Sequence, residues 1–404
     1  MPQLPQLTND SQFYQFLEAA VKYSGYADIS AFFREEFNEN TFPNAKWAEL
    51  FPAGEENEDG EYVQYTGVNT RPIMASYTSF NAQGQLIAND GFKVTSKDMP
   101  RMRLAMNFDE KSFRDGQKIQ RLKGIPEWNK MYSSFLKDST DLIAGIHTMR
   151  SYTALQIEST GLFKTTEKNN AGGVMNLEFN FLDGQEASNR RLAGAFGKKN
   201  KAKGKKKSWD NADAYPIGDL QDMFWTYRQE LGVPYTGVFR MSEATFDLLI
   251  THPTTIKEVA LWKTGYLADA TNLANVNVTE AEINDYLVNR LRLPKISVED
   301  WYGIYQCLDP KTQKRKKAPL QAFADGVVLL RPEGFVGDYQ WQAPTTLFAT
   351  SVNPMYLSDG GKIGVQQETY SRRKAMDFDA ESTGIPVPRN IDYFLYMDIA
   401  TLQP

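Results

Sequence analysis

A single apolar stripe along residues 126–160 constrains the fold of this chain more than any other feature. Its members recur at spacings of three, four or seven residues, as on one face of an amphipathic α-helix. They are Met131, Phe135, Leu142, Ile146, Met149, Thr153 and Ile157. Gly161 is a suitable C-terminal stop. A continuous helix of this length spans about 50 Å, so the stripe predicts a rigid spine whose apolar residues serve packing.

The composition leaves few kinds of chemistry open. With 404 residues, 41% hydrophobic and 24% charged, the chain can bury a sizeable core in two or three packed units. The one cysteine, Cys307, excludes an intrachain disulfide and a cysteine-based zinc site. Two histidines, His147 and His252, leave little imidazole chemistry. His147 lies beside the apolar stripe, and we interpret it as structural. We predict no catalytic, cofactor-binding or metal-binding residue and no cofactor.

Sequence motifs give no positive sign of an enzyme. No Walker-type or dinucleotide-binding glycine motif and no serine in a nucleophile elbow is present. Asp377, Asp379 and Glu381 are spaced like one face of a strand, and we interpret them as a solvated or interface face. No apolar run approaches the length of a membrane span, and the N-terminus lacks the pattern of a secretory signal.

Charge is distributed in blocks, although the net charge is only −5. Residues 35–61 hold nine acids against one base, and residues 85–123 hold nine bases against five acids. Blocks of opposite sign can pair within a subunit or between neighbours. The candidates for inter-subunit contact are Arg101 and Arg103 on the basic side and Glu55, Glu56, Asp59 and Glu61 on the acidic side. Simple solvated faces are the alternative.

A third block, residues 190–207, carries nine bases and no acid. It consists largely of Gly, Ala, Asn and Lys, a composition typical of a loop without its own core. Lysines neutralise phosphate charge without reading bases, so this block is a candidate for contact with nucleic acid. The DNA-facing candidates are Lys198, Lys199, Lys201, Lys203, Lys205, Lys206 and Lys207. A solvated insertion is the alternative.

The other segments give a coarse order of elements. Residues 11–23 predict a short amphipathic helix, and residues 63–113 predict a long two-stranded ribbon with few apolar positions. A hairpin is expected over 162–181, followed by helices and strands that alternate, as in a compact α/β unit. Its expected elements are helices at 220–231 and 243–251, a further element at 284–293, a strand at 236–242, a strand pair within 296–307, and strands at 324–331 and 394–399.

This order of elements resembles the lambda-type family of tailed-phage major capsid proteins, often named major capsid protein E, which has the Hong Kong 97-like fold. The stretches that carry the resemblance are DMPR at 98–101, YTALQIESTG at 152–161, PIGDL at 216–220, GVVLLRPEGFVG at 326–337 and APTT at 343–346. Together they cover most of the chain from about residue 60 onward. The Lys-rich block is longer and more basic than the family suggests, and no long N-terminal scaffold segment is visible.

The resemblance implies an α+β fold in five segments. They are an N-terminal arm (1–60), an extended β-ribbon or E-loop (61–123), a peripheral domain with the spine helix, hairpin and basic loop (124–215), an axial α/β domain (216–385) and a C-terminal strand that returns to the peripheral domain (386–404).

The resemblance also implies a role. Copies of the chain would form hexamers and pentamers of an icosahedral shell around double-stranded DNA, which they contact non-specifically. Further expected partners are a portal and scaffolding or decoration proteins, but no membrane. The location would be the virion, after assembly in the host cytoplasm. The alternatives are a protein that condenses nucleic acid through the Lys-rich block, a carboxylate-dependent hydrolase, and another virion protein such as a tail component.

Overall fold

The computed structural model describes the chain in segments. They are residues 45–66, 93–108, 125–166, 169–170, 177–182, 191–193, 208–229, 237–264, 277–308, 315–345, 355–370, 375–389 and 391–399, with single residues 25, 27 and 31. The predicted N-terminal helix at 11–23 and the Lys-rich residues 198–207 lie outside them.

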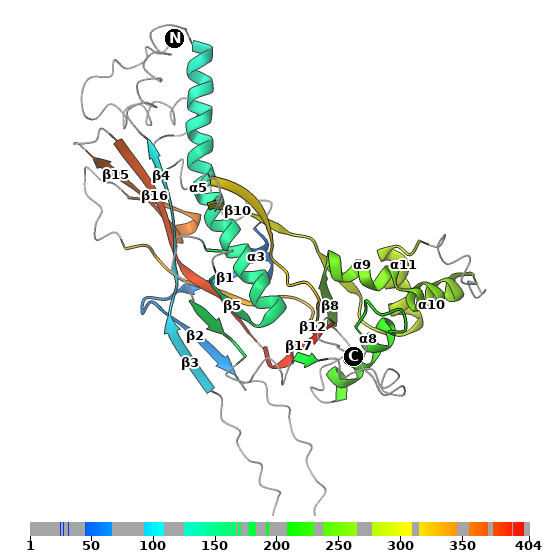
Figure 1. Cartoon of the computed structure of the whole chain (residues 1–404). Helices are drawn as coiled ribbons and strands as arrows, with labels where there is room; N and C mark the ends of the chain where they lie inside the picture. Colours follow the sequence, from blue (N-terminus) through cyan, green and yellow to red (C-terminus); the bar gives the residue numbers. More distant parts are fainter. Residues whose placement is uncertain are drawn as a thin grey trace, which may run out of the picture. The chain divides into compact units, whose positions relative to one another are not determined.

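Helix α5 (Ile125–Thr160) is 36 residues long and confirms the predicted spine (Figure 1). Where the structure describes its side chains, most of the apolar stripe is buried: Leu142, Ile146 and Ile157 are each at most 5% exposed, and Met149 is partly buried. The helix ends at Gly161, whose φ of 71° lies in the left-handed region that favours glycine. A Cβ at this position would also lie 2.7 Å from Leu182, so both backbone and packing explain the glycine.

The chain divides into two units. Unit 1 comprises Met1–Tyr62, Ser96–Ser151 and Asp338–Val387, and unit 2 comprises Val63–Thr95, Tyr152–Gly337 and Pro388–Pro404. Helix α5 contributes residues to both units. The predicted axial segment 216–385 likewise contributes to both, because its last strands belong to unit 1.

Unit 1 is built on a sheet that, within the described residues, has the strand order β1-β13-β16-β15-β14, with β4 also paired to β16. Its elements are α3 (Lys46–Leu50), β1 (Ala53–Glu56), β4 (Arg101–Phe108), β13 (Gly337–Gln342), β14 (Met355–Ser358), β15 (Ile363–Tyr370) and β16 (Ala375–Pro388). Phe378 and Ala380 of β16 are fully buried, whereas the alternate residues Asp377 and Asp379 are partly exposed. This alternation is the period of a strand with one face toward a core.

Strand β4 differs from the expectation for the ribbon. The sequence places residues 101–108 in the predicted ribbon, but β4 pairs antiparallel with β16 from Arg101 to Phe108. The ribbon is represented by β2 (Glu61–Thr66) and β3 (Lys93–Asp98), which pair as a two-stranded sheet. The residues between β2 and β3 are outside the described part of the chain.

Unit 2 contains a five-stranded sheet in the order β7-β17-β12-β8-β9, counted over the described residues. Its strands are β7 (Arg191–Ala193), β8 (Gly237–Ser242), β9 (Ile296–Glu299), β12 (Val327–Pro332) and β17 (Leu395–Asp398). Its helical elements are α8 (Pro216–Gln229), α9 (Glu243–Thr251), α10 (Pro253–Thr264), α11 (Glu280–Asp285) and the π-helical turn η2 (Tyr286–Arg290). This mixture of helices and strands confirms the predicted α/β unit.

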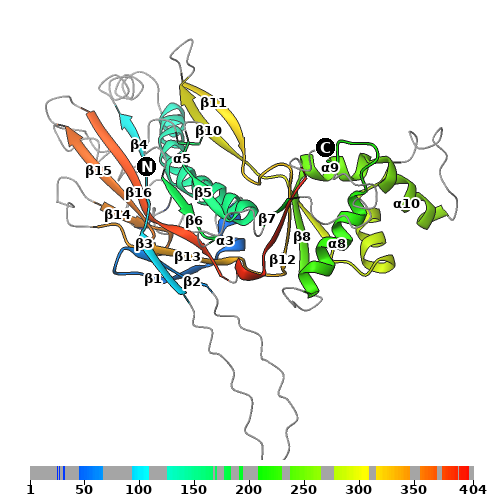
Figure 2. The same ribbon diagram turned by 60° about the horizontal axis from the view of Figure 1, so that its bottom comes forward.

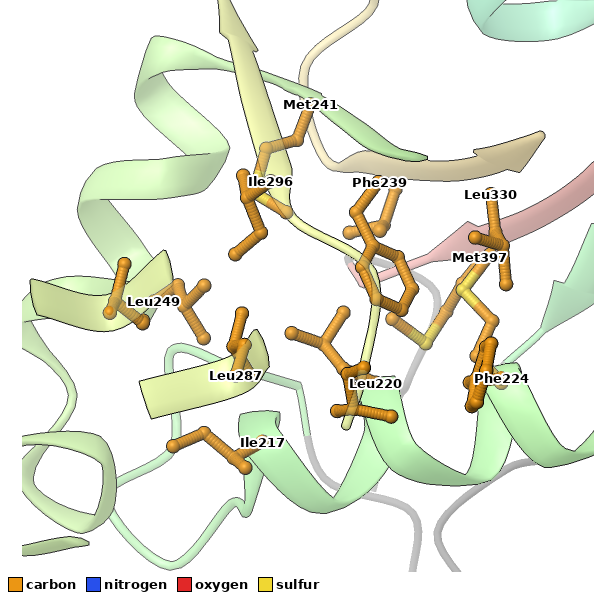
Figure 3. Close-up of a cluster of buried hydrophobic side chains, with 14 of the residues drawn as sticks. Ile217, Leu220, Phe224, Phe239, Met241, Leu249, Leu287, Ile296, Leu330 and Met397 are labelled. Carbon is orange, nitrogen blue, oxygen red and sulfur yellow. The ribbon is translucent and has the colours of Figure 1, made fainter. Parts of the chain in front are cut away.

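The core of unit 2 lies between this sheet and its helices (Figure 3). Phe239, Leu330 and Met397 of the sheet gather with Leu220 and Phe224 of α8, and all are at most 2% exposed. Because β12 is buried along Val327–Leu330, it reads in sequence as a continuous apolar run and not as an alternating one.

Two short hairpins complete unit 2. Strands β5 (Leu162–Lys164) and β6 (Glu178–Asn180) pair antiparallel, which confirms the hairpin predicted at 162–181. The two strands predicted within 296–307 are present as β9 and β10 (Tyr302–Leu308), but they do not pair with each other: β9 pairs with β8, and β10 pairs with β11 (Arg315–Gln321). Strand β9 has buried ends and joins the five-stranded sheet, whereas β10 begins with the exposed Tyr302.

Candidate assembly surfaces

The basic candidates Arg101 and Arg103 lie on β4 and already have partners within unit 1. The Arg101 guanidinium pairs with Glu381, and Nη2 of Arg103 lies 2.6 Å from Oδ2 of Asp379. The arginine side chains are 56% and 48% exposed, whereas the two carboxylates on β16 are 7% and 13% exposed. Solvent therefore screens these pairs from the arginine side.

The carboxylates on β16 are the trio that the sequence analysis singled out. Burial raises the pKa of Asp379, and the nearby Glu368 and Asp377 add to the rise, while Arg103 opposes it. The interpretation of Asp377, Asp379 and Glu381 as a solvated or interface face needs refinement, because two of the three form ion pairs with β4. In the described residues, no group of three or more His, Cys, Asp or Glu side chains is arranged to hold a metal ion.

The acidic candidates form an exposed patch that we name the acidic strip: Glu55, Glu56, Glu58, Asp59 and Glu61. Strand β1 and the following turn hold it against β13. The Trp341 Nε1–H donates to the Gly54 carbonyl at 2.9 Å, and the Gln342 amide donates to the Glu58 carbonyl at 3.1 Å. Gly60 takes a φ of 71°, which allows the turn into β2.

No ion pair joins the acidic strip to Arg101, Arg103 or any other described residue. A contact between the strip and these arginines across two copies of the chain stays a prediction. The strip is fixed by its backbone while its carboxylates reach solvent, so its geometry suits an external partner. The DNA-facing candidates, Lys198–Lys207, lie outside the described residues, and their role also stays a prediction.

Two buried charge clusters on α5 were not predicted. In unit 1, Arg150 is fully buried and donates to Asp359 at 2.7 Å and to the Ser382 hydroxyl at 2.7 Å. Its guanidinium lies 4.9 Å from the ring centroid of Trp47 and 4.7 Å from that of Tyr339. Such cation–π contacts gain strength when they are shielded from water.

His147 belongs to the same cluster. It is 2% exposed, and its Nδ1 accepts a hydrogen bond from the Trp47 indole at 3.1 Å. Burial, together with the charges of Arg150 and Lys362, lowers the pKa of His147 to about 3, although Asp359 opposes the shift. The imidazole is therefore neutral at pH 7, which fits the structural role expected from the sequence.

In unit 2, the fully buried Glu158 accepts from two arginines. Arg331 Nε lies 2.8 Å and Arg240 Nε 3.2 Å from its Oε1, and Arg240 also pairs with Glu299 at 2.7 Å. Burial by itself would raise the pKa of Glu158, but the two arginines outweigh it and hold the pKa below its ordinary value. This cluster joins the end of α5 to strands β8, β9 and β12.

The sequence held one signal for these clusters. Arg150 follows the buried Ile146 by one helical turn, and Glu158 follows the buried Ala154 in the same way. A charge at such a position points into a core and needs a partner. The partner strands are far away in the sequence, so the pattern could not have named them.

Comparisons with known proteins give matches in structure alone. No family model and no curated protein sequence matches the chain. A prophage capsid protein of E. coli CFT073 is 16% identical, with coverage of 98% of this chain and 99% of that one and a TM-score of 0.43. The capsid of an empty GTA particle is 10% identical, with coverage of 94% and 97% and a TM-score of 0.42. A phage-related protein of Bordetella bronchiseptica RB50 is 13% identical, with coverage of 90% and 94% and a TM-score of 0.41.

Two of these three solved structures are described as capsids. In the described part of the chain, no helix is both long enough and apolar enough to cross a membrane.

Proposed function

We propose that this chain is a phage major capsid protein whose copies assemble into hexamers and pentamers of an icosahedral shell around double-stranded DNA. The observation that carries the proposal is the order and pairing of its elements. After α3 and β1 come the paired strands β2 and β3, then β4, the 36-residue helix α5, the hairpin β5–β6 and the α/β unit. This is the order on which the family resemblance of the sequence rests.

The described surfaces support a role in assembly. A two-stranded sheet such as β2–β3 is only marginally stable by itself in water and gains from a partner. The acidic strip is exposed without an ion pair in the described residues, and Tyr65 and Val94 of β2–β3 are 56% and 49% exposed. Within unit 1, buried Arg150 of α5 donates to Ser382 of β16, and within unit 2, buried Glu158 of α5 pairs with arginines of β8 and β12.

Electron microscopy with negative stain, beside light-scattering mass, tests this proposal on the purified full chain. We expect hollow polyhedral particles, tubes, or rings of five or six copies. A species that stays monomeric at high concentration, in high salt and with a crowding agent would contradict the proposal. If that monomer were also retained on DNA in a salt-dependent way, the alternative of a nucleic-acid-condensing protein would replace it.

A further inference from the structure

The hairpin β10–β11 is an exposed feature to which the proposed function assigns no role. Its strands pair in register from Tyr302 opposite Gln321 to Leu308 opposite Arg315. In the described residues it is a separate two-stranded sheet. Figure 2 shows it projecting away from the five-stranded sheet of unit 2.

One face of this hairpin is exposed and apolar. Ile304 is 70% and Tyr302 is 48% exposed, and the register places Pro319 opposite Ile304 on the same face. Lys317, two positions along β11, is exposed as well, whereas Gly303 on the other face is buried. Exposed apolar side chains gathered on one projecting face are typical of a surface that another molecule covers.

The charge of the hairpin indicates what covers it. Residues 309–317 hold five bases, Lys311, Lys314, Arg315, Lys316 and Lys317, against the single acid Asp309. The acidic strip of unit 1 holds five acids and no base over residues 53–61. Arg101 and Arg103, the basic partners expected from the sequence, already face Glu381 and Asp379. The strip therefore remains as an exposed acidic segment, and the sequence of the hairpin carries the opposite net charge, with Lys317 exposed.

Among the described strands, the β1 part of the strip lies at a sheet edge. Strand β1 lies at the edge of the unit 1 sheet, where β13 is its neighbour on one side. Charged side chains on an edge strand prevent pairing with an identical edge. The same charges favour a basic segment, so they select a partner as well as reject one.

We propose that the β10–β11 hairpin of one copy docks on the acidic strip of a second copy. The inference rests on the proposed function, since it supplies a contact between subunits of the shell. Opposite charge steers and orients the two surfaces, and Tyr302 and Ile304 supply the apolar area that docking removes from water. A contact with DNA phosphates would need the charges alone and would leave these apolar side chains uncovered.

The test uses charge reversal in two full-length variants. One carries Arg315→Glu, Lys316→Glu and Lys317→Glu, which changes the charge of residues 309–317 from +4 to −2, and the other carries Glu55→Lys, Glu58→Lys and Asp59→Lys, which changes the charge of residues 53–61 from −5 to +1. We expect each variant by itself to require at least a tenfold higher protein concentration for assembly than the wild type. An equal mixture should assemble near the wild-type concentration, because each variant then meets the complementary charge only on the other. Ile304→Ser should raise the assembly concentration several-fold with the charges unchanged.

Controls separate a local contact from net charge and from misfolding. A triple variant with Arg228→Glu, Lys257→Glu and Arg290→Glu, at exposed positions of unit 2 outside the hairpin, changes the net charge as much as the hairpin variant and should leave assembly unchanged. Circular dichroism and monomer size should match the wild type in every variant, since Lys317, Ile304, Glu55 and Glu58 are exposed.

Three results would overturn the inference. The first is assembly of both variants at the wild-type concentration, while the wild type still forms particles; the proposed function would then stand without this contact. The second is recovery only when both sets of substitutions are in one chain and not in the mixture, which would place the contact within a subunit. The third is normal assembly of the hairpin variant with lost retention on DNA, which would make the hairpin a nucleic-acid surface. A wild type that never assembles would instead reject the proposed function.

Discussion

The two charge clusters on α5 show two ways of burying an ion in a core. In unit 1 the central ion is Arg150, which has one close carboxylate, Asp359, and two aromatic faces. Nζ of Lys362 lies 3.6 Å from the same carboxylate, so Asp359 has a second cationic partner. In unit 2 the central ion is Glu158, which forms ion pairs with both Arg240 and Arg331.

The difference lies in what remains when the central residue is removed. Without Arg150, Asp359 keeps Lys362 as a counter-ion. Without Glu158, Arg240 keeps Glu299 as a counter-ion, whereas the buried Arg331 keeps no ion pair among the described residues. A buried charge left without compensation is more costly than the net gain from its pair. The position of Glu158 should therefore tolerate substitution less well than that of Arg150.

Glu158→Gln should have the largest effect on stability. We expect a loss of about 3 to 5 kcal/mol, the range for removal of one partner from a buried ion pair. Urea denaturation gives the overall change, and hydrogen exchange of peptides from β8 and β12 shows whether unit 2 opens first. Glu178→Gln is the matched control, because its pair with Lys164 is 48% and 46% exposed and should contribute less than about 1 kcal/mol.

Arg150→Met tests the comparison directly. It removes the cation but keeps an apolar chain between the aromatic rings, and it leaves Asp359 with Lys362. We expect a smaller loss than for Glu158→Gln, about 1 to 3 kcal/mol, the cost of a buried polar group that loses part of its hydrogen bonding. An equal or larger loss for Arg150→Met would break the comparison.

The two clusters should also respond to acid at different pH values. His147 has a folded-state pKa of about 3 against an ordinary value of 6.5, so below pH 6.5 the unfolded chain binds a proton that the folded chain does not. The stability of unit 1 should be complete above pH 6.5 and fall as the pH approaches 3. The loss should be about 2 to 3 kcal/mol by pH 4.5.

The contribution of Glu158 to acid destabilisation should begin only at a lower pH than that of His147. Its pKa is lowered on folding, so its contribution is present above the ordinary glutamate value and is lost as the pH falls below that value. Hydrogen exchange between pH 6.5 and 4.5 should therefore show unit 1 peptides opening before those of unit 2. His147→Gln keeps a hydrogen-bond acceptor near Trp47 and should remove this pH dependence. If exchange in unit 1 stayed constant over that interval, the buried neutral imidazole would not explain its acid response.

The same clusters show how far the sequence could take the fold. The spine helix was predictable from local spacing, because every apolar residue of its stripe lies within one helix. The hairpin β5–β6 and helix α9 were predictable for the same reason, since their signals are contiguous. The pairing of β4 with β16 was not, because Arg101 and Glu381 meet only in the folded sheet.

For the candidate surfaces too, the sequence indicated what depends on contiguous residues but not which residues meet in the folded sheet. Charge blocks singled out the acidic strip, whose five acids within residues 55–61 are exposed in the structure, and its role in inter-subunit contact stays a prediction. They could not show that Arg101 and Arg103 have carboxylates on β16, because the trio at 377–381 looked solvated in isolation. The carboxylate partners of Arg101 and Arg103 are determined by the strand order of the sheet, in which β4 is the neighbour of β16.

The partly exposed ion pair Arg103–Asp379 on that sheet should contribute least to the free energy of unfolding. It tests whether burial is what makes an ion pair costly to remove. Arg103 and Asp379 lie at 2.6 Å, closer than the Arg240–Glu158 pair at 3.2 Å, yet the arginine is 48% exposed. If burial and not distance decides the cost, Arg103→Gln should change the free energy of unfolding by less than about 1 kcal/mol. The change should shrink further in 0.5 M salt, where exposed charges are screened. A salt-independent loss comparable to that of Glu158→Gln would show that the β4–β16 face is desolvated, and that a short ion pair can dominate stability without being buried on both sides.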